Sequence, residues 1–145
     1  MSTLDTAIVL ATVAHEGQKR KITNEPYILH PMRVMLKAIH FGMDFGIVAI
    51  LHDTLEDTSL TIPKLKQANF SGAIIDSICR LTKTLELPYN EYLDRLKSDP
   101  IARVVKVLDI EDNLYDLETV GTFAPEDEVR LRLKYETALA TLRGR

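Results

Sequence analysis

Apolar side chains recur at helical spacing along almost the whole chain, and no stretch of useful length alternates as a β-strand does. Within 3–18, for example, apolar residues at Leu4, Ala7, Ile8, Ala11 and Ala14 follow helical spacing. Helices with this spacing bury one face each and expose the other. We therefore expect an all-α fold, a compact multi-helix bundle.

Pro, Gly and short polar stretches divide the pattern into expected helices. Pro31 marks the start of one near His30, and the nearly all-apolar run at 45–53 is typical of a central, fully buried helix. The expected helices cover 3–18, 31–39, 45–53, 62–70, 71–83, 89–99, 101–120 and 124–145. A chain of 145 residues that is 46% hydrophobic can bury one core, so we expect a single domain over residues 1–145.

Composition excludes several classes of protein. The formal net charge of −3, with 27% charged residues, gives no reason to expect nucleic-acid or membrane binding. Cys79 is the only cysteine, so neither an intramolecular disulfide nor a cysteine-based zinc site can form. No apolar run reaches transmembrane length, and a basic signal-peptide flank is missing, so we expect a cytoplasmic protein. A homo-oligomer is compatible with this sequence.

The stretch AILHDTLEDT, 49–58, ends an apolar run with one histidine and three carboxylates. On one regular helix His52 and Asp53 diverge by roughly 100°, so both reach one ion only near a helix edge or end. Glu56 lies four residues after His52, and Asp57 lies four residues after Asp53, so the two members of each pair would share one face of the helix. We interpret the stretch as two metal ligands beside two proton-shuttling carboxylates. The alternative is a solvated acidic helix end.

Two further residues favour the metal site. His30 lies between a turn and a helix start, and Asp109 interrupts the apolar stripe of Val104, Val105 and Leu108. A carboxylate at a core-facing position is costly unless it is paired or bound to a cation. Together with His52 and Asp53 they form a mixed nitrogen and oxygen set, which suits Mn²⁺, Fe²⁺ or Zn²⁺ better than Mg²⁺ or Ca²⁺.

Three motifs resemble one known family, in the right order. AHEGQKRKITNEPYILHPMRV at 14–34, AILHDTLEDT at 49–58 and VKVLDIEDNL at 105–114 are similar to the AHxGQxRK…PYIxHPxxV, ALLHDxxEDT and VKLADxxxNL motifs of the RelA/SpoT family. The resemblance is to the HD-domain hydrolase of guanosine 3′,5′-bis(diphosphate), ppGpp, the alarmone of the stringent response. It implies an HD-domain bundle of the stand-alone small alarmone hydrolase type.

The resemblance also implies a role for each matching residue. His30, His52, Asp53 and Asp109 match the Mn²⁺ ligands, with Fe²⁺ or Zn²⁺ as alternatives. Glu56 and Asp57 match the acidic pair that activates the attacking water. The positions that match nucleotide-contacting residues are Arg20, Lys21, Lys83 and Asn113. A small-molecule nucleotide is thus the expected partner.

The last motif departs from the family pattern. Leu108 replaces the usual Ala, Ile110 replaces a basic residue, and DIEDN is more acidic than usual. The main hypothesis is a metal-dependent pyrophosphohydrolase that removes the 3′-diphosphate of ppGpp with a metal-activated water. Leu108 and Ile110 favour an alternative, an HD phosphohydrolase for another nucleotide or nucleoside phosphate. A non-enzymatic nucleotide sensor is the third hypothesis, and it is disfavoured because all six ligand and acidic positions are present.

Overall fold

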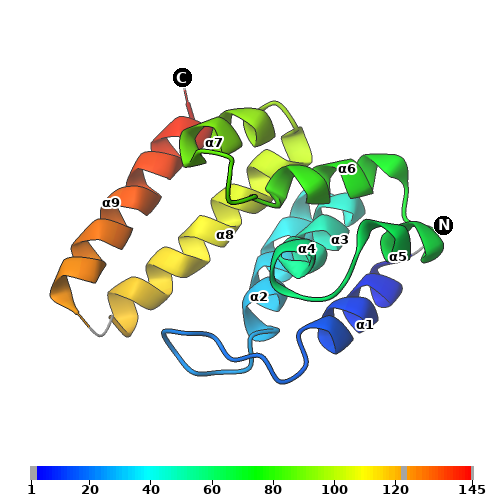
Figure 1. Ribbon diagram of the computed structural model, residues 1–145, viewed down its shortest axis with the longest axis horizontal. Helices are drawn as coiled ribbons and strands as arrows, with labels where there is room; N and C mark the ends of the chain where they lie inside the picture. Colours follow the sequence, from blue (N-terminus) through cyan, green and yellow to red (C-terminus); the bar gives the residue numbers. More distant parts are fainter. Residues whose placement is uncertain (1–2, 122–123, 145) are drawn as a thin grey trace.

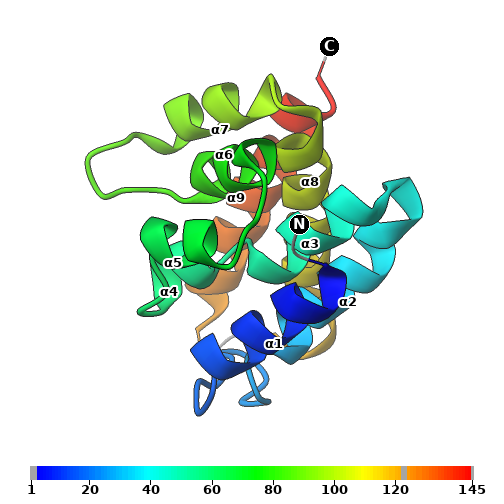
Figure 2. The same ribbon diagram turned by 90° about the vertical axis from the view of Figure 1, so that its right-hand side faces the viewer.

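The computed structural model describes residues 3–121 and 124–144, and in these ranges the chain is a bundle of α-helices (Figures 1 and 2). The all-α expectation is confirmed. The described residues contain no strand beyond an isolated bridge that pairs Lys19 with Pro26. The helices are α1 Leu4–Ala14, α2 Leu29–Ala38, the 3₁₀ turn η1 Ile39–Phe41, α3 Met43–Leu51, α4 Thr54–Asp57, α5 Ile62–Gln67, α6 Gly72–Leu81, α7 Tyr89–Lys97, α8 Pro100–Thr119 and α9 Pro125–Leu142.

Helix α3 is the centre of the bundle, as its all-apolar sequence indicates. It packs against α1, α2, α6 and α8, and Val48, Ala49, Ile50 and Leu51 are fully buried in it. The long helix α8 lies across α2 and α3 and packs its other side on α9 (Figure 1). Because α2, α3 and α8 meet in the core, polar side chains near their contacts are brought together and removed from water.

Local sequence signals set several helix starts. Thr3, Thr61, Ser71 and Asp99 cap α1, α5, α6 and α8 by accepting backbone N–H groups with their side chains. Helix α2 begins at Leu29, two residues before Pro31, so His30 lies inside its first turn. The sequence-based ends of the first and last helices ran longer than the observed ones, and Arg145 lies outside the described residues.

The stretch around His52 corrects the expectation of one continuous helix. Helix α3 ends at Leu51, and α4 begins only at Thr54, so His52 and Asp53 lie in a break between two helices. Asp53 has φ −101° and ψ −3°, off the regular helical path. The side chains therefore do not diverge as they would on a regular helix, and the His52 imidazole and the Asp53 carboxylate lie 3.1 Å apart (Nε2 to Oδ2).

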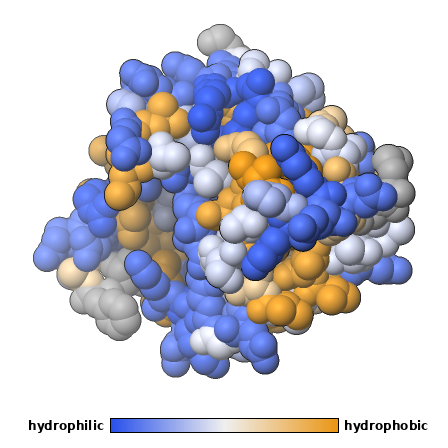
Figure 3. All heavy atoms as spheres, turned by 45° about the vertical axis from the view of Figure 1, so that its right-hand side comes forward, coloured by the Kyte–Doolittle hydropathy of each residue, from blue (hydrophilic) through white to orange (hydrophobic). Residues whose placement is uncertain are grey.

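The surface is what the composition indicates. Hydrophilic side chains cover much of the face in Figure 3, with apolar residues in patches between them. Among the described residues, no helix combines the length and the apolar character needed to cross a bilayer.

The central position of α3 predicts a large cost for shortening its buried side chains. Ile50→Ala should lower the free energy of unfolding in urea by about 2–5 kcal/mol, because it leaves a cavity in a close-packed core. Leu36→Ala is the matched control, since Leu36 is 59% exposed on α2. That variant should stay within about 0.5 kcal/mol of the wild type. Equal effects of the two changes would contradict the packing described here.

Candidate metal centre

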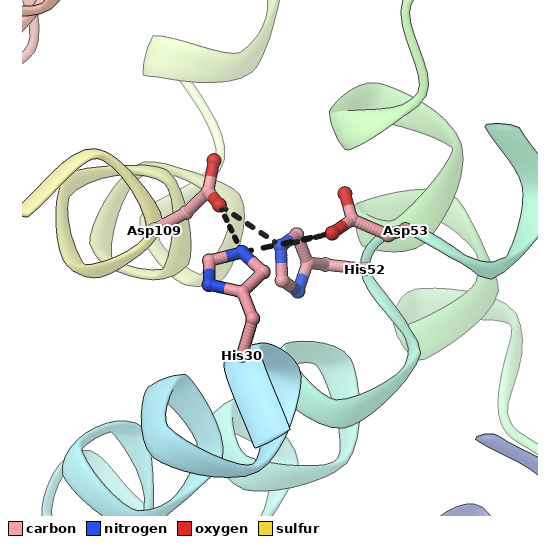
Figure 4. A group of neighbouring side chains, drawn as sticks. All are labelled: His30, His52, Asp53 and Asp109. Carbon is pink, nitrogen blue, oxygen red and sulfur yellow. Dashed lines mark hydrogen bonds and ion pairs between the residues drawn. The ribbon is translucent and has the colours of Figure 1, made fainter. Parts of the chain in front are cut away.

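Four side chains from three parts of the bundle point into one buried spot (Figure 4). His30 comes from α2, His52 and Asp53 come from the break after α3, and Asp109 comes from the middle of α8. One donor atom from each lies within 4.8 Å of all the others. His30, His52 and Asp109 are buried, and the Asp53 side chain is only 16% exposed. The sequence motifs thus converge in space, although they are up to 79 residues apart.

The two imidazoles present the same nitrogen to this spot. His30 Nδ1 donates to Asp112 Oδ2 at 2.6 Å, and His52 Nδ1 donates to the Ala49 carbonyl oxygen. Each Nε2 faces Asp109 Oδ1 instead, at 2.8 Å for His30 and 3.2 Å for His52. An imidazole whose Nδ1 is committed to an acceptor has its Nε2 oriented for a metal ion.

This packing shifts the pKa values of all four side chains. Burial lowers the pKa of His30 and of His52, but the adjacent carboxylates outweigh it, so that both pKa values lie above the usual one. Burial raises the pKa of Asp53 and of Asp109, but the His52 imidazole beside Asp53 and the Lys106 ammonium beside Asp109 outweigh it and both pKa values are lowered. Two ionised carboxylates and two imidazoles form a site in which a divalent cation can take the place of the Nε2 protons.

Asp57 and Glu56, the acidic pair of the second motif, lie in different surroundings. Asp57 is near Asp53, and partial desolvation, together with the charges of Asp53 and Glu56, raises the pKa of Asp57 to about 6. Glu56 turns to the connection after α6, where its Oε1 accepts the Lys83 backbone N–H at 2.7 Å. Asp57 therefore has the pKa of a group that exchanges protons near neutral pH, while Glu56 also ties α4 to the segment that carries Lys83.

The expected nucleotide-contacting residues occupy different environments. Arg20 is buried against α8, where its Nη2 donates to Asn113 Oδ1 at 2.8 Å and its Nε donates to Asp116 Oδ2 at 2.6 Å. Lys21 is exposed on the loop beside it. The Lys83 side chain is half-buried, and its Nζ donates to the Thr84 carbonyl oxygen. Arg20 and Asn113 are thus brought together, while Lys83 lies on a separate segment next to Glu56.

Sequence reasoning missed several residues that contact the cluster. Tyr27 donates its hydroxyl to Asp53 Oδ2 at 2.6 Å, and Lys106 Nζ lies 3.0 Å from Asp109 Oδ2. Asp112 holds His30, as described above. Spacing was the available signal: Tyr27 lies three residues before His30, and Lys106 and Asp112 lie three residues on either side of Asp109, on the same helix face.

Relatives of known description match most of the chain. No protein-family model matches it. A guanosine-3′,5′-bis(diphosphate) 3′-pyrophosphohydrolase from Aquifex aeolicus is 35% identical over 138 residues, which is 90% of this chain and 19% of the relative. The bifunctional (p)ppGpp synthase/hydrolase SpoT of Escherichia coli is 27% identical over 135 residues, or 86% of this chain and 19% of the relative. The chain therefore spans about a fifth of the length of these curated relatives.

A solved structure shares the fold. It is described as a metazoan ortholog of SpoT that hydrolyzes ppGpp, and it superposes with a TM-score of 0.84 at 21% identity, covering 99% of this chain and 87% of the other. At that identity the likeness establishes the fold alone, and the sequence relatives add the family. The three motifs, the relatives and the shared fold together show that the chain belongs to the RelA/SpoT family of HD-domain proteins.

Proposed function

We propose that the chain is a metal-dependent pyrophosphohydrolase that removes the 3′-diphosphate of ppGpp and releases pyrophosphate. The convergence of His30, His52, Asp53 and Asp109 on one buried spot carries the proposal. The activities for which the Aquifex and Escherichia relatives are named support the substrate, since these relatives match 90% and 86% of the chain. In this proposal residues 1–145 act as one HD-type unit.

The four converging side chains are the proposed metal ligands, with Mn²⁺ as the resident ion and Fe²⁺ or Zn²⁺ as alternatives. The donor set fits such an ion because it mixes imidazole nitrogen with carboxylate oxygen and because both Nε2 atoms are pre-oriented. A bound divalent ion would supply positive charge that lowers the pKa of water and offsets charge on the phosphoryl oxygens. Tyr27 and Lys106 hold one oxygen each of Asp53 and Asp109, which fixes the two carboxylates.

Asp57 and Glu56 are the proposed acid/base pair. Asp57 takes the proton of the attacking water, since its pKa of about 6 leaves it mostly ionised at neutral pH yet able to hold a proton. Glu56 lies on the same short helix and is anchored to the Lys83 amide. The anchored carboxylate keeps α4, and with it Asp57, fixed beside the cluster.

Arg20, Lys21, Lys83 and Asn113 are the proposed nucleotide contacts. The charge of Arg20 is largely compensated by Asp116 and Asp112, so its contribution is a fixed planar surface more than a free positive charge. Lys21 and Lys83 then supply charge for the phosphates. Cations are needed here, because the carboxylates of the cluster repel an anionic substrate.

Leu108 and Ile110, the residues that favoured a nucleotide other than ppGpp as substrate, have packing roles. Ile110 is fully buried in the core, and Leu108 packs against the core, so these two departures from the family motif affect packing. A buried Ile110 does not read a nucleotide base. All six ligand and acidic positions are present, which favours an enzyme over a nucleotide sensor.

Metal binding should be lost when a ligand is removed. Asp53→Ala and His52→Ala should each lose bound Mn²⁺ and activity together, because three donors remain of a four-donor set. Elemental analysis of protein purified with Mn²⁺ and then dialysed measures this. Unchanged metal content in Asp53→Ala would show that the ligand assignment is wrong.

Catalysis should separate from metal binding at the acidic pair. Glu56→Gln and Asp57→Asn should each keep the metal and lose on the order of 10²-fold or more in turnover, the scale of general acid/base catalysis. Turnover of the wild type should also fall as the pH drops through about 6, because Asp57 must be ionised to accept a proton, and Asp57→Asn should lose that step. A metal-loaded double variant with wild-type turnover would rule out the acid/base role.

Substrate recognition should divide between two neighbouring residues. Arg20→Ala should mainly raise KM with metal content unchanged, and Lys21→Ala should weaken binding most for the more highly phosphorylated substrates. A panel of guanosine and adenosine 3′-pyrophosphates and nucleoside monophosphates, with pyrophosphate and phosphate assayed separately, measures both. Equal hydrolysis of the two bases, unaffected by Arg20→Ala, would show that Arg20 does not read the base.

A further inference from the structure

Helix α8 carries a second row of carboxylates next to Asp109. Asp112 and Asp116 follow Asp109 by three and seven residues, so the three side chains share one face of the helix. Asp112 is 3% exposed and Asp116 is 5% exposed. Ionised carboxylates are rarely buried to this extent unless specific donors hold them.

Both oxygens of the Asp112 carboxylate accept hydrogen bonds. Its Oδ2 accepts from His30 Nδ1 at 2.6 Å and from Arg33 Nη2 at 3.0 Å, while its Oδ1 accepts from Arg33 Nε at 2.9 Å. Arg33 in turn donates to Glu25 Oε1 at 2.9 Å. The two-pronged contact with Arg33 fixes the plane of the Asp112 carboxylate, and that carboxylate fixes the ring of His30.

Asp116 makes the corresponding contact with the loop between α1 and α2. It accepts from Arg20 Nε at 2.6 Å, and Asn113 accepts from Arg20 Nη2 at 2.8 Å. Two nitrogens of the planar guanidinium are thereby held, which restricts the orientation of its plane. Backbone hydrogen bonds also close the loop: the Arg20 backbone N–H donates to the Glu25 carbonyl oxygen, and the Asn24 backbone N–H donates to the Arg20 carbonyl oxygen, each at 2.8 Å.

We propose that Asp112 and Asp116 are positioning residues with separate tasks: Asp112 orients His30 toward the metal, and Asp116 holds Arg20 and its loop in place for the nucleotide. This inference rests on the proposed function and deepens it. It also gives a purpose to one carboxylate of the acidic DIEDN stretch, Asp112. One helix face thus aligns the metal ligands and the nucleotide-binding loop through different side chains.

The separation of tasks makes Asp112→Asn and Asp116→Asn a matched pair. Both changes remove one charge from the same face of α8. Asp112→Asn weakens mainly the contacts with His30 and Arg33, and Asp116→Asn weakens mainly the contact with Arg20, because the crossed ion pairs are longer, at 3.6 Å for Arg20 with Asp112 and 3.8 Å for Arg33 with Asp116. Asp112→Asn should lower Mn²⁺ affinity by roughly 10–100-fold, the usual effect of losing the hydrogen-bond partner of a ligand histidine. Its turnover should be restored by excess Mn²⁺. Asp116→Asn should keep Mn²⁺ affinity within about twofold and raise KM with little change in kcat, because the ligand set is untouched.

Two direct readouts are needed, neither of which depends on turnover. Competition with a chelator gives the Mn²⁺ affinity of each variant. Hydrogen exchange by mass spectrometry over 18–27 reports the loop amides, including those of Arg20 and Asn24. Loop exchange should be several-fold faster in Asp116→Asn and should change less in Asp112→Asn, in which Arg20 keeps its 2.6 Å contact with Asp116.

Each outcome decides the inference. Wild-type Mn²⁺ affinity in Asp112→Asn, or unchanged loop exchange in Asp116→Asn, overturns the corresponding task. Equal losses of affinity and loop protection in both variants would show general destabilisation and overturn the separation. If Asp112→Asn does not fold, Arg33→Gln takes its place in the test. The Arg33 side chain is 35% exposed, and its replacement removes the two-pronged contact with the Asp112 carboxylate. Arg33→Gln should lower Mn²⁺ affinity several-fold, and unchanged affinity would overturn the role of Asp112.

The same experiment keeps this inference distinct from the proposed function. A wild-type protein that binds no Mn²⁺ would refute the metal site itself. A wild type that binds Mn²⁺ but hydrolyses no alarmone would refute the substrate and leave both positioning roles measurable. A fully active wild type with an unaffected Asp112→Asn would refute the positioning role alone.

Discussion

The cost of burying the Asp109 carboxylate is the constraint on which the rest of the site depends. A carboxylate with 4% exposure in a helix bundle is unstable as an ion unless positive charge and hydrogen bonds surround it. Lys106 holds one of its oxygens, and the imidazoles of His30 and His52 face the other. Helices α2, α3 and α8 must therefore meet at this carboxylate, and the central packing of α3 lets them do so.

The break between α3 and α4 brings the Asp53 carboxylate to the other three side chains of the cluster. On a regular helix the side chains of His52 and Asp53 would point in directions about 100° apart. The chain leaves the helical path between Leu51 and Thr54, and the Tyr27 hydroxyl holds the Asp53 carboxylate on the side of the imidazoles. The apolar run thus ends in charge at this point because the helix ends there, beside the buried cluster formed with His30 and Asp109.

Much of the fold could be predicted from the sequence because its determinants are local. Helical periodicity gave the all-α class, and caps such as Thr61, Ser71 and Asp99 lie where side-chain acceptors precede apolar runs. The break at His52 could not be predicted this way, since its stabilising contacts come from Tyr27 and from α8, distant in sequence. The burial of Arg20 could not be predicted for the same reason: it depends on Asp116, 96 positions away.

The candidate site was predicted in part by motif spacing and in part by resemblance. The motifs identify the four side chains that converge in the structure, and their role as metal ligands stays a prediction. The residues that hold them escaped notice because a supporting contact has no spacing rule of its own. Asp112, for example, reads as one more charge on an acidic helix until His30 and Arg33 are seen to share its oxygens.

The central claim is that one divalent ion sits among His30, His52, Asp53 and Asp109. Anomalous diffraction at the manganese absorption edge, from crystals grown with Mn²⁺, tests it most directly. The account predicts one strong peak within bonding distance of the two Nε2 atoms and of one oxygen from each carboxylate. A peak at another position, or no peak among these side chains at saturating Mn²⁺, would contradict it.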